Sequence, residues 1–123
     1  MIKKFKKIVI KIGSSSIVNE KTRKIKVDWI TSVCNDIKLI HPNKKIIIVC
    51  SGAIALGSKF IGKNSIRKLE DKQAAAAIGQ IELTKSWEKY LEKNKIKAAQ
   101  ILLTLEDSEI RRRYLNVRKT INA

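Results

Sequence analysis

The chain is short of the residues that build metal sites and disulfide frameworks. Its 123 residues include one proline, one histidine and two cysteines. Cys34 and Cys50 are too far apart for a C-x-x-C pair, and His41 has no partner at metal-ligand spacing. We therefore expect no metal site built from protein ligands and no disulfide. Two reduced thiols are typical of a cytoplasmic protein.

Long hydrophobic runs are also lacking. No apolar stretch approaches the roughly 18 residues that a membrane span requires. The start, MIKKFKKIVIKIG, has a basic head and an apolar continuation, but Lys11 interrupts that continuation before it reaches the length of a signal-peptide core. We expect neither a membrane partner nor an export signal.

Acidic residues are few: 11 Asp and Glu stand against 27 Lys and Arg, for a formal net charge of +16. Such a charge is compatible with binding to nucleic acid or another polyanion. The lysines are nevertheless spread along the whole chain, without interleaved aromatic residues for base stacking, and only residues 111–113 form a tight basic cluster. We expect nucleic acid not to be the main partner. A non-catalytic basic module that binds polyanions stays open as the alternative function.

Hydrophobic periodicity predicts alternating strands and helices within one domain. Short β-branched runs predict strands over 7–12, 45–50 and, more weakly, 96–103. Apolar residues at helical spacing predict helices over 27 to about 41, 71 to about 93, and 110 to the end. The candidate loops are 13–26, 41–44 and 57–70. We expect Asp28 to cap the first helix and Pro42 to end it.

This order of elements predicts an α/β fold, a parallel sheet with helices on both faces. The long second helix is expected to turn one apolar stripe inward, formed by Ala77, Ile81, Trp87 and Leu91. Ligands of such sheets gather beyond the carboxyl ends of the strands. Gly13 and Ser51 are therefore expected at the same edge of the sheet.

Three small residues, Ser51, Gly52 and Ala53, follow the second predicted strand directly. A strand that turns at once into a helix with open N–H groups needs small residues, so that a ligand can approach the backbone. The Ser51 hydroxyl can add a hydrogen bond, and a helix N-terminus favours a carboxylate or a phosphate. A tight turn without a ligand explains this segment equally well on its own.

A second motif, KIGSS at residues 11–15, follows the first strand. Lys11 can direct a fixed positive charge at the edge of the sheet, while Gly13, Ser14 and Ser15 offer N–H and hydroxyl donors to phosphoryl oxygens. Phosphoryl transfer requires alignment and stabilisation of charge of this kind. An ordinary lysine beside a serine-rich turn is the alternative. The Walker-like GSKFIGKN at 57–64 is set aside because Asn64 replaces the hydroxyl that binds magnesium.

Five segments together resemble the glutamate 5-kinases, a branch of the amino acid kinase family. They occur in the family's order and read KIVIKIGSSSI, IIIVCSGAIALG, DKQAAAAIGQ, QILLT and RRRYLNVRKTI. The resemblance implies a three-layer α/β/α sandwich and a cytoplasmic transferase. Such an enzyme uses ATP and Mg²⁺ to phosphorylate the γ-carboxylate of L-glutamate, the first step of proline biosynthesis. It also implies a homo-oligomer.

The resemblance further implies roles for both motifs. Lys11 resembles the family's catalytic, phosphate-contacting lysine, and with Gly13, Ser14 and Ser15 it would bind ATP. Ser51, Gly52 and Ala53 resemble the loop that receives glutamate. Cys50 stands where the family often has threonine or serine, which we expect to change packing more than chemistry.

The family continues well beyond the length of this chain. Residues 1–123 are therefore expected to be the N-terminal, substrate-side part of an amino acid kinase domain, incomplete at the C-terminus and without the nucleotide-binding half. We expect these residues to be inactive as a kinase by themselves.

Overall fold

Two parallel strands and the helix that connects them form the base of the fold. The computed structural model describes residues 4–62, 66–103 and 111–123. Strand β1 (Lys7–Ile12) pairs in parallel with strand β2 (Lys45–Cys50), in a register that sets Lys7 opposite Lys45 and Ile12 opposite Cys50. Both strands have the predicted bounds, because β-branched runs of six residues favour extended backbone.

Helix α2 (Val27–Ile40) makes the crossover between the strands, and the 3₁₀ turn η2 (His41–Asn43) ends it at the predicted proline. The predicted cap is wrong. Lys26 is the N-cap residue, because its carbonyl already accepts the N–H of Ile30 at 3.0 Å. Asp28 lies inside the first turn instead, where its carboxylate complements the helix dipole.

The other helices are α1 (Ser14–Ile17), α3 (Ala53–Ile61), α4 (Leu69–Glu92) and α6 (Arg111–Asn122). Helices α4 and α6 confirm two predictions to within two residues, and Ile110 lies outside the described residues. Helix α1 occupies part of the expected loop 13–26. Helix α3 begins where the small residues predicted a helix but continues to Ile61, into the expected loop 57–70, because its residues pack on α4.

The predicted third strand is wrong: residues 96–103 are extended but pair with no strand in the described part of the chain. Ile96 is buried, whereas the apolar residues that follow are exposed, Leu102 at 73%. A side-chain hydrogen bond from Gln100 Nε2 to Thr84 Oγ1 at 2.7 Å ties the segment to α4. A β-branched run becomes a strand only when a neighbour offers it backbone partners.

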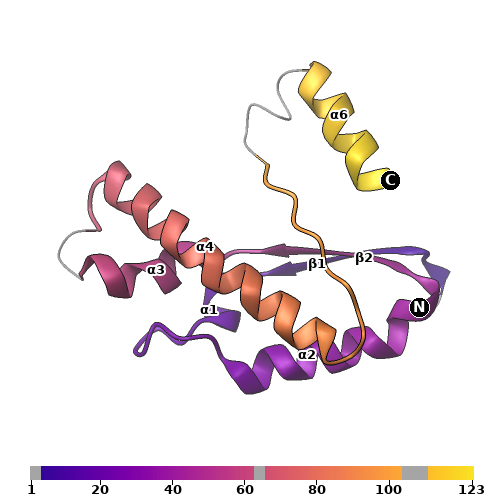
Figure 1. Ribbon diagram of the computed structural model, residues 1–123, viewed down its shortest axis with the longest axis horizontal. Coiled ribbons are helices and arrows are strands. Elements are labelled where there is room, and N and C mark those ends of the chain that lie inside the picture. The colour runs from indigo at the N-terminus through magenta and orange to yellow at the C-terminus, as the bar shows by residue number, and fades with distance from the viewer. Residues whose placement is uncertain (1–3, 63–65, 104–110) are drawn as a thin grey trace.

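The core lies on one face of the sheet. Alternate strand residues such as Ile10 and Ile48 point toward the core, where they pack against buried side chains of α2, α3 and α4. Figure 1 shows α2 below the two strands and α4 crossing in front of them. On the opposite face Val9 is 64% exposed and Val49 is 51% exposed. The described residues thus give a mixed α/β fold with one covered face, and the expectation of helices on both faces is not met within them.

Helix α4 buries a different stripe from the predicted one. Trp87 and Leu91 are buried as expected, but Ala77 is exposed and Ile81 is 59% exposed. The buried set is Ala75, Gly79, Leu83, Trp87, Tyr90 and Leu91. The small residues of α4 turn inward because α3 approaches them closely. None of the helices that the structure describes is both long and apolar enough to cross a membrane.

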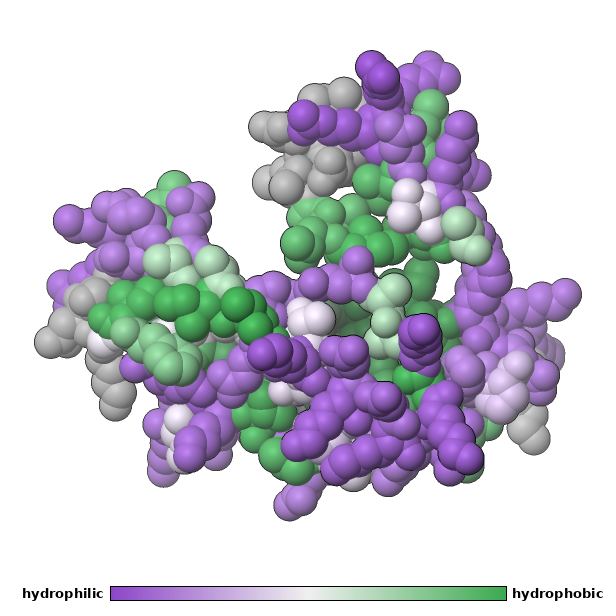
Figure 2. All heavy atoms as spheres, viewed as in Figure 1, coloured by the Kyte–Doolittle hydropathy of each residue, from purple (hydrophilic) through white to green (hydrophobic). Residues whose placement is uncertain are grey.

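Apolar surface is also exposed away from the sheet. Figure 2 shows it over α3 and the facing side of α4, and again along the extended segment that leads to α6. Phe60 of α3 is 64% exposed, and Ile78 and Ile81 of α4 lie beside it along one groove of about 500 Å³. Helix α6 buries none of its residues.

Candidate functional site

The two predicted motifs meet at the carboxyl ends of the strands. The N–H of Ser51 donates to the carbonyl of Ile12 at 3.0 Å, which extends the strand pairing by one residue. Gly52 then lies directly against the turn that follows β1, since a Cβ atom on it would be 3.2 Å from Val18 Cγ2 and 3.3 Å from Ile17 Cγ2. The expected juxtaposition of Gly13 and Ser51 at one edge is confirmed.

The KIGSS loop (residues 11–15) spans the end of β1 and the start of α1, and all of it except the buried Ile12 is open to solvent. Lys11 is exposed and lies on the uncovered face of the sheet, opposite Val49. Gly13 is the N-cap of α1, with φ −76° and no atom within 4 Å of the position of a Cβ. Its backbone does not require glycine, and the space beside it is open to a ligand. The hydroxyl-bearing residues 14–16 are exposed as well.

Hydrogen bonds from Lys26, at the start of α2, fix the loop and the turn that follows it. The ammonium group of Lys26 donates to the carbonyl of Ser15 at 2.9 Å, and its backbone N–H donates to the carbonyl of Ile17 at 2.8 Å. Buried Ile17 and Val18 anchor the other end in the core. Lys26 was not identified from sequence, because nothing in the pattern of a lysine-rich chain separates a structural lysine from its neighbours.

The SGA loop (residues 51–53) turns β2 into α3. Gly52 has φ +124°, a conformation that L side chains rarely adopt, and it caps α3 without a side-chain hydrogen bond. The first bond of the helix runs from the Leu56 N–H to the Gly52 carbonyl at 3.0 Å. The N–H groups of residues 53–55 therefore precede the helical ladder and have no acceptor within it. They are the donors that an anion needs.

Ser51 contributes a hydroxyl rather than an N–H group. Its N–H is committed to the strand pairing, whereas its exposed side chain has no hydrogen-bond partner in the part of the chain that the structure describes. The expectation of open N–H groups thus holds for the residues after Gly52 and not for Ser51 itself. A side-chain hydroxyl beside free helix N–H groups can bind a carboxylate or a phosphate.

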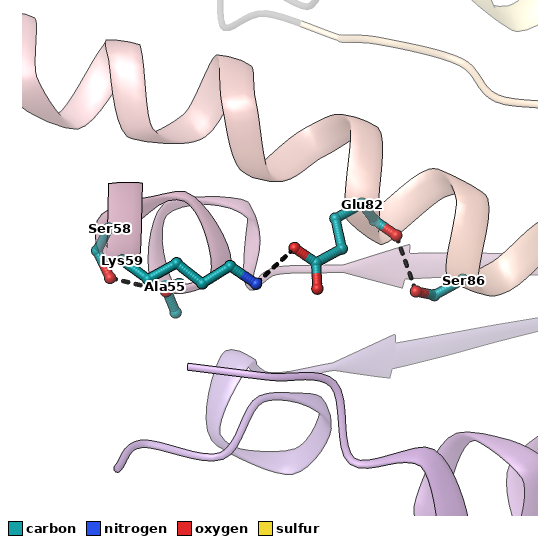
Figure 3. Close-up of polar contacts among 5 residues, drawn as sticks. All are labelled: Ala55, Ser58, Lys59, Glu82 and Ser86. Carbon is teal, nitrogen blue, oxygen red and sulfur yellow. Dashed lines mark hydrogen bonds and ion pairs between the residues drawn. The ribbon is translucent and has the colours of Figure 1, made fainter. Parts of the chain in front are cut away.

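Helix α4 supports the SGA loop through close backbone contacts. A Cβ atom on Gly79 would lie 1.7 Å from the carbonyl oxygen of Ala53, and one on Gly57 would lie 1.8 Å from the carbonyl oxygen of Ala75. Figure 3 shows the polar contact that accompanies this crossing, in which Lys59 of α3 reaches Glu82 of α4 at 2.8 Å. Gly57 is buried in this crossing, so the segment that imitates a Walker loop has no phosphate-binding role at that end.

The glycines of the crossing were not predicted as structural. The hydrophobic pattern places Gly79 only inside the predicted helix over 71 to about 93, although a glycine inside a helix costs about 1 kcal/mol relative to alanine and therefore indicates a packing constraint. That signal was available from the sequence.

Both cysteines are free and lie in or beside the core. Burial raises the pKa of the Cys34 thiol to about 11. Burial also raises the pKa of Cys50, and the indole N–H of Trp87 opposes that rise. Sulfur is a weak acceptor, and Trp87 Nε1 has no hydrogen bond of ordinary geometry among the described residues. The Cys50 thiol donates to the Ser51 carbonyl at 3.1 Å, so it packs behind the loop in its protonated form.

Comparison with known proteins places this sequence in a family. The family described as "Amino acid kinase family" matches residues 6–123. The chain is 51% identical over 118 residues to glutamate 5-kinase of Agrobacterium fabrum, covering 94% of this chain and 30% of that protein. It is 46% identical over 122 residues to glutamate 5-kinase of Nitrobacter hamburgensis, covering 98% of this chain and 32% of the relative. The corresponding enzyme of Sinorhizobium fredii is 46% identical over 123 residues, with 98% and 31% covered.

The chain spans about a third of the length of these relatives. The match includes both loops at the edge of the sheet and the helices that support them. This chain belongs to the amino acid kinase family.

Proposed function

We propose that these residues supply the glutamate-binding loop and part of the phosphate-binding loop of a glutamate 5-kinase. The reaction transfers the γ-phosphoryl group of ATP to the γ-carboxylate of L-glutamate in the cytoplasm, as the first step of proline biosynthesis. The observation that carries the proposal is the meeting of the KIGSS and SGA loops, in which the Ser51 N–H donates to the Ile12 carbonyl at 3.0 Å. Two anionic reactants must be brought together, and two donor-rich loops lie side by side here.

The SGA loop is proposed as the site of glutamate. The free N–H groups of residues 53–55 and the positive end of the α3 dipole favour a carboxylate. The Ser51 hydroxyl lies at the same place and can donate one further hydrogen bond. Gly52 supplies the positive-φ turn that starts α3, and a side chain on it would meet Ile17 and Val18 of the turn after β1.

The KIGSS loop is proposed as the site of the ATP phosphates. The Lys11 ammonium group would stabilise the charge that develops on the transferred phosphoryl group, which makes it the proposed catalytic residue. Gly13, Ser14 and Ser15 would donate to phosphate oxygens. Residues 11–18 and 50–53 include no Asp or Glu, so the Mg²⁺ that accompanies ATP would be held here by the phosphates and not by these loops.

We also propose that residues 1–123 are the N-terminal, substrate-side part of a three-layer α/β/α domain. The exposed Val9 and Val49 and the unburied helix α6 support this, because apolar faces of this kind are normally covered. Relatives three times as long have the additional chain that would cover them. The nucleotide-binding half would belong to that additional chain.

A homo-oligomer is proposed on similar grounds. The groove is lined by Phe60 of α3 and, on α4, by the apolar Ile78 and Ile81 and the charged Lys85 and Lys89. An exposed groove that combines apolar and charged residues is a candidate for an interface between subunits.

The experiment that tests the function is a chimaera. Residues 1–123 would replace the matching third of the Agrobacterium fabrum enzyme, and acyl phosphate would be trapped as the hydroxamate with glutamate, ATP and Mg²⁺. We expect activity that depends on both substrates, and its loss in the same chimaera carrying Lys11→Ala. A folded, soluble chimaera without activity would contradict the proposal.

The basic-module alternative is favoured by one observation, the exposed Arg111, Arg112 and Arg118 of α6. A filter-binding assay with the 123-residue chain and single-stranded DNA separates the two functions. The kinase proposal predicts only weak binding that disappears at about 0.3 M salt, because a charge-driven interaction of this kind is screened. Tight binding that persists in salt would favour the alternative.

A further inference from the structure

Gly79 of α4 meets the SGA loop at backbone level. A Cβ atom at this position would lie 1.7 Å from the oxygen and 2.7 Å from the carbon of the Ala53 carbonyl, and 2.7 Å from the N atom of Gly57. All three obstacles are backbone atoms, so no side-chain rotation can relieve the overlap. The first turn of α3 therefore rests directly on the surface of α4.

The rest of α3 is fixed to α4 by contacts further from the loop. Gly57 makes the reciprocal close approach, in which its Cβ would meet the carbonyl of Ala75 at 1.8 Å. Beyond it, Lys59 and Glu82 form an ion pair at 2.8 Å, shown in Figure 3. Of these contacts, only the one at Gly79 includes a residue of the SGA loop.

The position of this turn decides whether its N–H groups can bind an anion. Hydrogen bonds of this type are made at 2.7–3.2 Å and weaken steeply with distance and angle. A methyl group at Gly79 needs roughly 1 Å or more of additional separation, which exceeds that tolerance. Misplacement by about 1 Å is also enough to reduce a reaction rate about 100-fold.

We propose that Gly79 is a positioning residue for glutamate: it lets α4 set the position of residues 53–55 and hence the geometry of the carboxylate site. This inference rests on the proposed function for the identity of the ligand, whereas the positioning itself is independent of it. A purely structural role makes a different prediction, since ligand affinity would then follow overall stability.

The test compares Gly79→Ala with Gly57→Ala in the 123-residue chain. Both variants place a methyl group in the same helix crossing, so both are expected to lose stability in urea denaturation. In ¹⁵N–¹H spectra, Gly79→Ala is expected to shift the amides of residues 51–55, and Gly57→Ala chiefly those around Ala75. The dissociation constant for L-glutamate is expected to rise at least tenfold in Gly79→Ala and less than threefold in Gly57→Ala.

The outcomes separate the two proposals. Unchanged loop amides in a folded Gly79→Ala variant would overturn the positioning role. Equal losses of affinity and stability in both variants would overturn it too. If the unmodified chain binds no glutamate while its loop amides still respond to Gly79→Ala, the positioning role stands and the proposed function falls.

A second measurement covers the case in which Gly79→Ala does not fold. In native-state hydrogen exchange of the unmodified chain, the Leu56 amide is bonded to the Gly52 carbonyl and reports opening of the loop. We expect it to open together with the α4 amides near Gly79, with the same dependence on denaturant. Independent opening of the loop at lower denaturant would overturn the proposal.

Discussion

Replacing Gly52 with alanine is expected to lower the free energy of unfolding by about 2 to 4 kcal/mol. The backbone of Gly52 has φ +124° and ψ −7°, which an L residue adopts only with strain of about 1 to 3 kcal/mol. The new methyl group would also sit 3.2 Å and 3.3 Å from the γ-methyl groups of Val18 and Ile17, both fully buried. Moving such side chains off their rotamers adds about 1 kcal/mol.

Urea denaturation of the 123-residue chain measures this loss as a lower midpoint at unchanged slope. Gly13→Ala is the matched control, because Gly13 has φ −76° and nothing within 4 Å of its Cβ position. That variant is expected to stay within about 1 kcal/mol of the unmodified chain, with a small gain from the stiffer unfolded state. A Gly52→Ala variant as stable as Gly13→Ala would refute the conformation assigned to this turn.

Three further predictions concern single side chains. In the chimaera, Lys11→Ala should lower kcat/KM by at least 100-fold, or about 3 kcal/mol, with little change in stability, and near-normal turnover would remove Lys11 from the mechanism. Ser51→Ala should weaken L-glutamate binding by about 1 to 2 kcal/mol in isothermal titration, the usual contribution of a hydrogen bond to a charged group, and unchanged affinity would indicate a plain turn. The buried Cys34 has its pKa raised to about 11, so above about pH 9 the unfolded chain loses this proton first and stability falls as the pH rises toward 11. Between pH 8 and 11 the free energy of unfolding of the unmodified chain should fall by up to about 3 kcal/mol more than that of Cys34→Ala. If the two proteins lost stability in parallel as the pH rises, the burial of Cys34 would be contradicted.

The elements that were predicted well are those that local sequence determines. The runs KIVIKI and KIIIVC specify strands by themselves, and α2 ends before Pro42 because proline disrupts the interior of an α-helix. The third strand failed because pairing depends on a neighbouring backbone, which residues 96–103 lack among the described elements. The prediction of which face of α4 turns inward was wrong for a related reason. The contact with α3 turns Ala75 and Gly79 inward and leaves Ile81 exposed.

The residues of the candidate site also fall into those that the sequence predicts and those that it does not. The rule that ligands gather at the carboxyl ends of parallel strands was sufficient to bring Gly13 and Ser51 to one edge. The residues behind the loops were not predictable by that rule. Lys26 and Gly79 act through distant contacts, to the Ser15 carbonyl and to the Ala53 carbonyl, and such contacts exist only once the helices have packed.

The most direct test of the central claim is a ¹⁵N–¹H titration of the 123-residue chain with L-glutamate and, separately, with ATP and Mg²⁺. If the two loops are the two halves of a phosphoryl-transfer site, glutamate will shift the amides of residues 51–55 and ATP those of residues 11–15. D-glutamate at the same concentration will shift the SGA loop less. Shifts confined to the basic residues of α6 with every anion, and absent from both loops, would contradict the claim.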